Sequence, residues 1–244
     1  MKKNKPFGFT LIELLVVISI IAILAGIALP VFGEVQTRGA QTKALSNAKQ
    51  VGTACKLFAM DYNGNFPYYL DPVERRGEPQ DANRVLQTLI PDYLPEKGVF
   101  SIPKSAYCKK RASSGSGELA QSKLDSGDNE WAYVAGLSDT SNSRFPLLAD
   151  GFAPGSTTNP YYVADENLPG GVWKGKKAVV IRVDISGNVE NTYRQGQSGS
   201  ATARYTVKRT DDNPRQNAFQ KDPGANPPWL SGPDVQVLNP LSPN

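Results

Sequence analysis

The sequence predicts an α+β protein in which a long N-terminal helix, first a membrane-spanning stem and then an amphipathic half, packs on a small antiparallel sheet, with an irregular C-terminal region. Three observations predict this class. An uncharged apolar segment runs from Leu14 to Gly33, an amphipathic helical pattern follows it, and strand-like segments occupy the second half. The 22 Gly and 19 Pro residues among 244 indicate many turns and loops.

Composition restricts the possible functions. Lys and Arg total 27 against 23 Asp and Glu, a net charge of +4, without the clustered basic face that a nucleic-acid partner requires. The chain has no histidine, which excludes Ser-His-Asp triads and Cys-His nucleophiles, and two cysteines are too few for a Cys₄ metal site. The sequence therefore predicts a protein that is not an enzyme and does not bind nucleic acid.

The N-terminus begins with a short leader, residues 1–8, that carries three lysines. The uncharged segment that follows spans about 30 Å as a helix, which matches the hydrocarbon core of a bilayer. The positive-inside rule keeps the lysines cytoplasmic and places the rest of the chain outside. This pattern alone fits a cleaved secretory signal, a permanent anchor or a prepilin-type leader.

Glu13 separates these interpretations. It is a carboxylate within the apolar segment, and insertion there costs roughly 2.5–3.5 kcal/mol at a helix centre, less near the interface. A plain signal or anchor gains nothing from it. Such a residue indicates a function that supplies a partner for the charge.

The run Gly8-Phe9-Thr10-Leu11-Ile12-Glu13 resembles the prepilin motif of type IV pilins and type II secretion pseudopilins. The resemblance covers residues 5–33. It implies that a prepilin peptidase cuts between Gly8 and Phe9 and that Phe9 becomes N-methylated. It also implies that Glu13 pairs with the N-terminal amine of a neighbouring subunit during assembly.

The resemblance implies a structural subunit of a type II secretion pseudopilus or a type IV pilus. The expected partners are prepilin peptidase, other pilin or pseudopilin subunits, an inner-membrane assembly platform and, before assembly, the lipid bilayer. The expected location is the bacterial inner membrane, crossed once, and then a periplasmic or surface filament. An alternative is a membrane-anchored extracytoplasmic binding protein outside any filament, with a glycan site lined by aromatic residues such as Tyr68, Tyr69, Tyr161, Tyr162 and Trp173.

Five segments follow from these patterns: the leader 1–8, a transmembrane and assembly helix 9–33, an amphipathic helix 34–64, an α+β head 65–208 and a Pro-rich tail 209–244. Pro30 is expected to kink or locally melt the helix. Beyond it, an apolar stripe at helical spacing predicts the face that packs on the sheet: Ala44, Ala48, Val51, Cys55, Phe58 and Tyr62. Asn63-Gly64 should end the helix near Tyr62.

In the head, a short helix is expected over Ala82–Ile90, with Asp81 as its N-cap. Strands are expected over Trp131–Ala135, Phe145–Ala149, Ala178–Ile185, Val189–Tyr193 and Ala201–Val207. Ser186-Gly187-Asn188 should form the turn of a hairpin between the third and fourth of these. The tail, with its many prolines, is expected to be extended and partly disordered, with Trp229-Leu230 holding it to the head.

Two further sites are expected in the head. Cys55 and Cys108 should form a disulfide, because their number is even and the compartment is oxidising. The acidic run from Asp125 to Glu130 contains oxygen ligands without the EF-hand spacing, so Asp125 and Asp128 are weak calcium candidates and a solvated turn is favoured. No other cofactor is expected.

Overall fold

A computed structural model describes residues 10–68, 81–102, 104–108, 123–195, 203–210, 216–232 and 234–242, without the side chain of Pro30. The chain forms two compact units, residues 1–41 and 42–244. Helix α1 (Leu11–Asp61) supplies the described part of the first unit, which we call the stem, and continues into the second, which we call the head. The boundary between the two units lies within the range of the predicted amphipathic helix, 34–64.

The end of α1 confirms the predicted helix stop. Asn63 and Gly64 have φ angles of 54° and 81°, the left-handed conformation that commonly follows a helix. The Gly64 amide donates to the carbonyl of Ala59 at 2.8 Å, which satisfies one of the carbonyls left free at a helix end.

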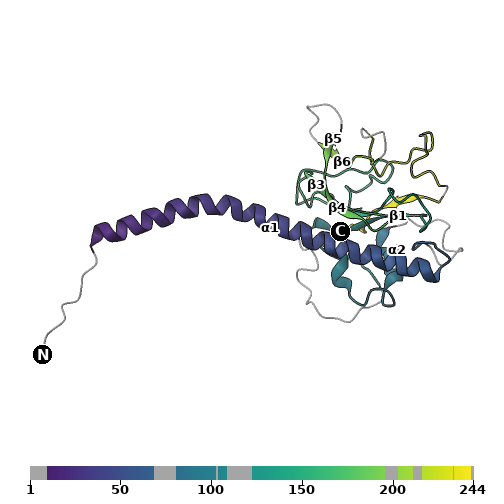
Figure 1. The fold of residues 1–244 in the computed structure, drawn as a ribbon, viewed down its shortest axis with the longest axis horizontal. Coiled ribbons are helices and arrows are strands. Elements are labelled where there is room, and N and C mark those ends of the chain that lie inside the picture. The colour runs from purple at the N-terminus through teal and green to yellow at the C-terminus, as the bar shows by residue number, and fades with distance from the viewer. Residues whose placement is uncertain are drawn as a thin grey trace. The chain divides into compact units, whose positions relative to one another are not determined.

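The head contains a five-stranded antiparallel sheet in the order β4-β3-β2-β1-β7. Figure 1 labels β1, β3 and β4 of this sheet in the head. Its strands are β1 (Trp131–Ala135), β2 (Pro146–Asp150), β3 (Lys177–Arg182), β4 (Gly187–Asn191) and β7 (Gln236–Leu238). β1, β2 and β3 are buried almost throughout. Their continuous apolar runs therefore reflect a sheet that is covered on both faces.

The predicted β3–β4 hairpin is confirmed, but its turn comes earlier in the chain. Gly187 already pairs with Ile181 as part of β4, and the turn is closed by the Arg182 amide, which donates to the Ser186 carbonyl at 2.9 Å. Ile185 adopts a φ of 63° within this turn. The predicted alternation of β3 ends for the same reason, because residues 183–185 belong to the turn.

The last predicted strand belongs to a separate two-stranded sheet. β5 (Tyr193–Gln195) pairs with β6 (Arg204–Thr206), and neither strand joins the main sheet. A backbone bridge between Tyr162 and Tyr205 connects this ribbon to the rest of the head.

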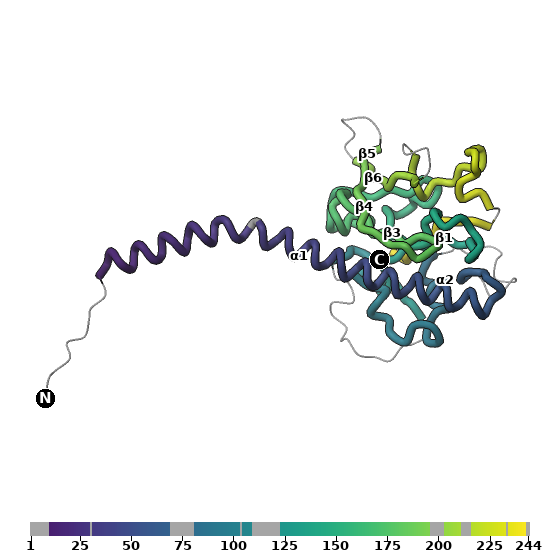
Figure 2. Tube along the Cα trace, viewed as in Figure 1, coloured from purple at the N-terminus to yellow at the C-terminus, as the bar shows by residue number. Residues whose placement is uncertain are grey.

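The C-terminal part of α1 lies on the main sheet (Figure 2). A Cβ atom on Gly52 would lie 3.1 Å from Ile181 Cγ2, and one on Gly187 would lie 3.1 Å from Leu45 Cδ1, so helix and hairpin are in direct contact. The predicted stripe is buried from Ala44 through Phe58. Tyr62 departs from the prediction, since it is 40% exposed at the helix end.

Short helical segments cover another part of the head. α2 (Ala82–Leu86) continues as the 3₁₀ helix η1 (Gln87–Leu89), and η2 (Lys97–Phe100) follows. Asp81 caps α2 as predicted, with its carboxylate accepting the Arg84 amide at 2.9 Å.

The described tail residues belong to the head, held there by Trp229-Leu230 as expected. Residues 211–215, 233 and 243–244 lie outside the described residues, so partial disorder of the tail stays a prediction. β7 pairs with β1 and so forms one edge of the main sheet. Trp229 and Leu230 are buried, and the Trp229 indole donates to the Ala218 carbonyl at 2.8 Å. The prolines prevented a strand prediction, but the short segment 236–238 contains none.

Candidate functional site in the stem

The stem exposes its apolar side chains on every side. From Leu11 to Val35, all sixteen Leu, Ile, Val and Phe side chains are between 46% and 84% exposed. α1 contains an 18-residue window with a mean hydropathy of 2.9, none of it buried. A helix that is apolar all round needs a non-aqueous environment. By length and composition, this one can cross a membrane.

The first turn of α1 is closed by a capping box that the sequence analysis missed. Thr10 precedes the helix, and its hydroxyl accepts the Glu13 amide at 3.2 Å. In return, Glu13 Oε2 accepts both the Thr10 amide and the Thr10 hydroxyl at 2.8 Å. The pattern Thr-x-x-Glu at a helix start could have revealed this arrangement.

The capping box leaves Glu13 half satisfied. Oε2 holds two hydrogen bonds, while the described residues supply no partner for Oε1. The helix start also places a negative side chain at the positive end of the helix dipole. Glu13 is therefore held in position with one oxygen available to an external donor.

Two other hydroxyl side chains in the stem are satisfied within the helix. The Ser19 hydroxyl donates to the Leu15 carbonyl at 2.8 Å, and the Thr37 hydroxyl donates to the Gly33 carbonyl at 3.0 Å. Such bonds remove the penalty for placing a hydroxyl in lipid.

The predicted processing site lies outside the described residues, because Gly8, Phe9 and the three leader lysines precede residue 10. α1 is continuous through residue 30, so the expected local melting is wrong. A kink at Pro30 stays a prediction.

No disulfide joins Cys55 to Cys108 in this structure, which contradicts the prediction, and both side chains are buried. Cys55 lies on the face of α1 that packs on the sheet, and burial raises the pKa of its thiol. Cys108 ends a different described segment, 104–108, in which residues 105–108 are buried. Each cysteine fills a place in the core as a small apolar side chain.

The two weak calcium candidates are engaged by lysines. Asp125 pairs with Lys123 at 3.2 Å, and Asp128 pairs with Lys97 at 3.4 Å. Asp128 also accepts the Asp125 amide at 3.1 Å, which closes the predicted acidic turn. Within the described ranges, no group of three or more His, Cys, Asp or Glu side chains could hold a metal ion. Calcium binding stays a prediction.

A buried carboxylate pair in the head was also missed. Glu130 and Asp150 are fully buried, and each has one oxygen without a hydrogen-bond partner. Glu130 accepts the Ser105 hydroxyl, while Asp150 Oδ2 accepts the Trp173 indole at 2.9 Å and the Val179 amide at 2.6 Å. No local sequence pattern predicts this pair, because the two residues come together only through the pairing of β1 with β2.

Burial raises the pKa of Asp150 to about 7, although the bonds from Val179 and Trp173 lower it in part. Burial also raises the pKa of Glu130, and the charge of Asp150 raises it further. Burial therefore favours the protonated form of both carboxyls.

The aromatic residues of the alternative interpretation do not form one site. Tyr162 and Trp173 are core residues, Tyr161 lies under the Arg204 guanidinium at 4.6 Å, and Tyr69 is outside the described residues. Tyr68 lines a cleft at the end of α1.

Comparisons with known proteins match the N-terminal region. Residues 3–29 match a family model described as the prokaryotic N-terminal methylation motif. The chain is 53% identical over 51 residues to the type IV major pilin protein PilA of Myxococcus xanthus, covering 21% of this chain and 23% of that protein. It is 43% identical over 61 residues to the prepilin peptidase-dependent protein D of Escherichia coli, covering 25% and 42%.

A third relative is the type IV major fimbrial protein FimA of Dichelobacter nodosus, 41% identical over 59 residues, which cover 24% of this chain and 38% of that protein. The chain thus spans between about a quarter and two fifths of the length of these relatives. No solved structure matches the chain significantly.

Proposed function

We propose that this chain, which belongs to the type IV pilin and pseudopilin family through its N-terminal segment, is a structural subunit of a pilin-type filament and not an enzyme. The filament is a type II secretion pseudopilus or a type IV pilus. The observation that carries the proposal is an entirely exposed apolar stem that begins with a half-satisfied carboxylate at Glu13.

The proposed life cycle begins in the bacterial inner membrane, which the chain crosses once. The leader lysines stay cytoplasmic and the head lies outside. Prepilin peptidase cuts between Gly8 and Phe9, and the new amine on Phe9 is methylated. An inner-membrane assembly platform then transfers the subunit to a filament with other pilin or pseudopilin subunits.

The geometry of Glu13 supports a pairing role in assembly. Thr10 fixes one carboxylate oxygen, so the other is presented at the start of the helix. A neighbouring Phe9 amine would supply the cationic donor that a desolvated carboxylate needs. The capping box lowers the penalty for Glu13 before assembly, when the stem is surrounded by lipid.

Mass spectrometry of the mature chain tests the processing step. We expect a loss of the first eight residues and one added methyl group, and we expect Gly8→Val to block both, because a branched side chain does not fit where the peptidase accepts glycine. An intact Met1 or a cut near Gly26 would contradict the proposal.

Fractionation into membrane and sheared-filament pools, with the cognate assembly machinery present, tests the role of Glu13. We expect Glu13→Val to leave membrane insertion intact or improved, because a costly charge is removed, and to reduce the filament pool. Glu34→Val is the matched control, since Glu34 is an exposed carboxylate farther along α1. Equal filament pools for Glu13→Val and wild type would show that Glu13 is not an assembly determinant.

A further inference from the structure

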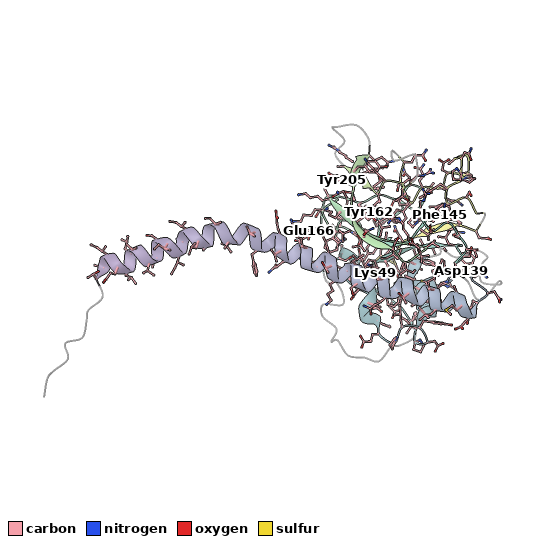
Figure 3. All side chains as sticks on the ribbon, viewed as in Figure 1. Lys49, Asp139, Phe145, Tyr162, Glu166 and Tyr205 are labelled. Atoms are coloured by element: carbon pink, nitrogen blue, oxygen red, sulfur yellow. The ribbon has the colours of Figure 1, made fainter. Side chains whose placement is uncertain are left out.

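A cleft of about 530 Å³ lies in the head at the C-terminal end of α1. Its volume falls in the range of small-molecule sites. Asp139, labelled in Figure 3, lies beside it, where the Asp139 amide donates to the Gly64 carbonyl at 2.9 Å. The lining comes from the end of α1 and the segment after it, from the β1–β2 connection and from the residue before Val235: Phe58, Asp61, Tyr62, Asn63, Asn65, Phe66, Tyr68, Gly136, Leu137, Ser138 and Asp234.

Backbone contacts hold these distant segments together. Phe66 donates its amide to the Leu137 carbonyl at 3.3 Å, next to a backbone bridge between Asn65 and Ser138. Gly136 has a φ of 80°, and a Cβ atom there would lie 2.3 Å from the Asp234 carbonyl oxygen, so only glycine allows this approach. The cleft is therefore preformed, which reduces the entropy cost of binding a ligand.

Aromatic rings form one side of the cleft. Phe58 and Tyr62 stack with centroids 4.1 Å apart and an interplanar angle of 10°. Phe58 is buried, whereas Tyr62 is 40% exposed. The stack fixes the orientation of Tyr62, and its ring offers an apolar surface with a polar hydroxyl at the edge.

Polar groups without partners complete the lining. In the described part of the chain, neither the Asn63 amide nor the Asp234 carboxylate has a hydrogen-bond partner, and Asp61 uses only Oδ2, which accepts the Tyr93 hydroxyl at 2.7 Å. An amide both donates and accepts, and a carboxylate accepts. Together these groups can bind adjacent hydroxyl groups of a ligand, because a hydroxyl also both donates and accepts.

Charge narrows the class of ligand. The lining contains two carboxylates and, among the residues that define it, no Lys or Arg, so an anionic ligand would be repelled. A cation would leave the side-chain amide donor of Asn63 unused. A neutral polyhydroxylated ring uses the aromatic face, the donors and the acceptors at the same time.

We infer that this cleft binds a neutral carbohydrate, with a sugar ring stacked on Tyr62 and its hydroxyls bonded to Asn63 and Asp234. This binding activity goes beyond the structural role proposed above, since it uses the head and not the stem. It would give each assembled subunit a site for glycans.

Saturation-transfer NMR on the full chain tests the inference, in a zwitterionic detergent that contains no sugar. The probes are neutral tetrasaccharides of β-linked glucose, α-linked glucose, N-acetylglucosamine and mannose. We expect at least one to receive saturation from the protein. Tyr62→Ala should weaken its binding about tenfold, and Asp234→Ala should weaken it severalfold, while Tyr62→Phe keeps the ring and should retain binding.

Tyr193→Ala is the control, because Tyr193 lies on the separate β5–β6 ribbon. Its binding should equal that of wild type. The inference is overturned if no probe binds, or if Tyr62→Ala and Asp234→Ala, with thermal unfolding like wild type, bind as well as wild type. Titration with calcium chloride and with tetramethylammonium tests whether the cleft is instead a cation site. If the protein binds these cations and none of the tetrasaccharides, the inference of a carbohydrate site is also overturned.

Discussion

The stem and the head handle apolar surface in opposite ways. The stem exposes every large apolar side chain from Leu11 to Val35, whereas the head buries a core that includes Trp131, Tyr133 and Phe152. For the stem, the stabilisation that burial gives must come from surroundings outside its own fold, whereas for the head it comes from the same chain. The contrast shows that the stem is built for an environment outside its own fold.

The similarity to known proteins follows the same division. The matched family model covers residues 3–29, and the similarities to the three relatives extend over at most a quarter of the chain. Under the proposed function, the stem fits both lipid and other stems, which restricts its sequence at many positions. A head needs only to keep its own core, so its sequence can vary far more.

The largest expected difference between the two units comes from the same substitution made in each. Phe152 is buried against Phe219 and Tyr162, with ring centroids 4.9 Å and 5.0 Å away. Phe152→Ala should lower the free energy of unfolding of the head by about 3–5 kcal/mol, because it leaves a cavity. Phe32→Ala, at an exposed stem position, should leave it unchanged.

Tryptophan fluorescence during denaturant unfolding measures this difference. All three tryptophans, Trp131, Trp173 and Trp229, are buried in the head, so the signal reports on that unit alone. An equal loss of stability in Phe32→Ala would mean that the core of the head depends on the stem.

The stability of the head should depend on pH. Burial raises the pKa of Asp150 from 3.8 to about 7. Between these values the folded head keeps a proton that the unfolded chain has lost, so the free energy of unfolding should fall as pH rises, by up to roughly 4 kcal/mol. Glu130, whose pKa is also raised, adds a loss of the same sign.

The same fluorescence assay at several pH values checks this. Asp150→Asn keeps an oxygen to accept from Trp173 and Val179 but cannot ionise, so its stability should depend much less on pH in this interval. Asp92→Asn, at an exposed position, should behave like wild type. Stability that rises with pH from 4 to 7 in wild type would contradict the assignment.

Local patterns predicted much of this fold, because helices and strands have short sequence periods. The stripe from Ala44 to Phe58, the Asn63-Gly64 helix end and β1 were all readable in this way. The pairing of β7 with β1 was not, since it joins residues about a hundred positions apart and nothing local encodes it.

The candidate sites, like the elements of the fold, were predictable where local sequence determines them and not where tertiary packing does. The importance of Glu13 was readable because a charge in an apolar segment is costly, and its cap was readable in principle from the spacing to Thr10. The supposed disulfide failed because an even number of cysteines carries no information about distance. Glu130 and Asp150 were missed because burial of a carboxylate depends on tertiary packing.

Replacement of a glycine by alanine should have opposite effects on stability in the two units. Gly64 has a φ of 81°, and a Cβ atom there would lie 2.6 Å from Asp139 Oδ1, so Gly64→Ala should destabilise the head by about 1–2 kcal/mol. Gly39 lies within α1 in open space, so Gly39→Ala should stabilise the helix locally by about 1 kcal/mol.

Tryptophan fluorescence should detect the first change, and amide hydrogen exchange along residues 36–42 should detect the second as slower exchange. If both alanine variants stabilise the protein, the left-handed conformation at Gly64 is not needed for the helix end.

The smallest expected effect concerns the capping box at the start of the stem. Thr10→Val keeps the shape of the side chain but removes the hydroxyl that accepts the Glu13 amide and donates to Glu13 Oε2. Loss of an N-cap costs about 1 kcal/mol, so amides in residues 11–14 should exchange about fivefold faster in micelles. Thr10→Ser retains the hydroxyl and should exchange like wild type, and the unfolding midpoint of the head should be the same in all three proteins. Unchanged exchange in Thr10→Val would show that the cap does not hold the first turn, and Glu13 would then be free to turn toward a partner without Thr10 to orient it.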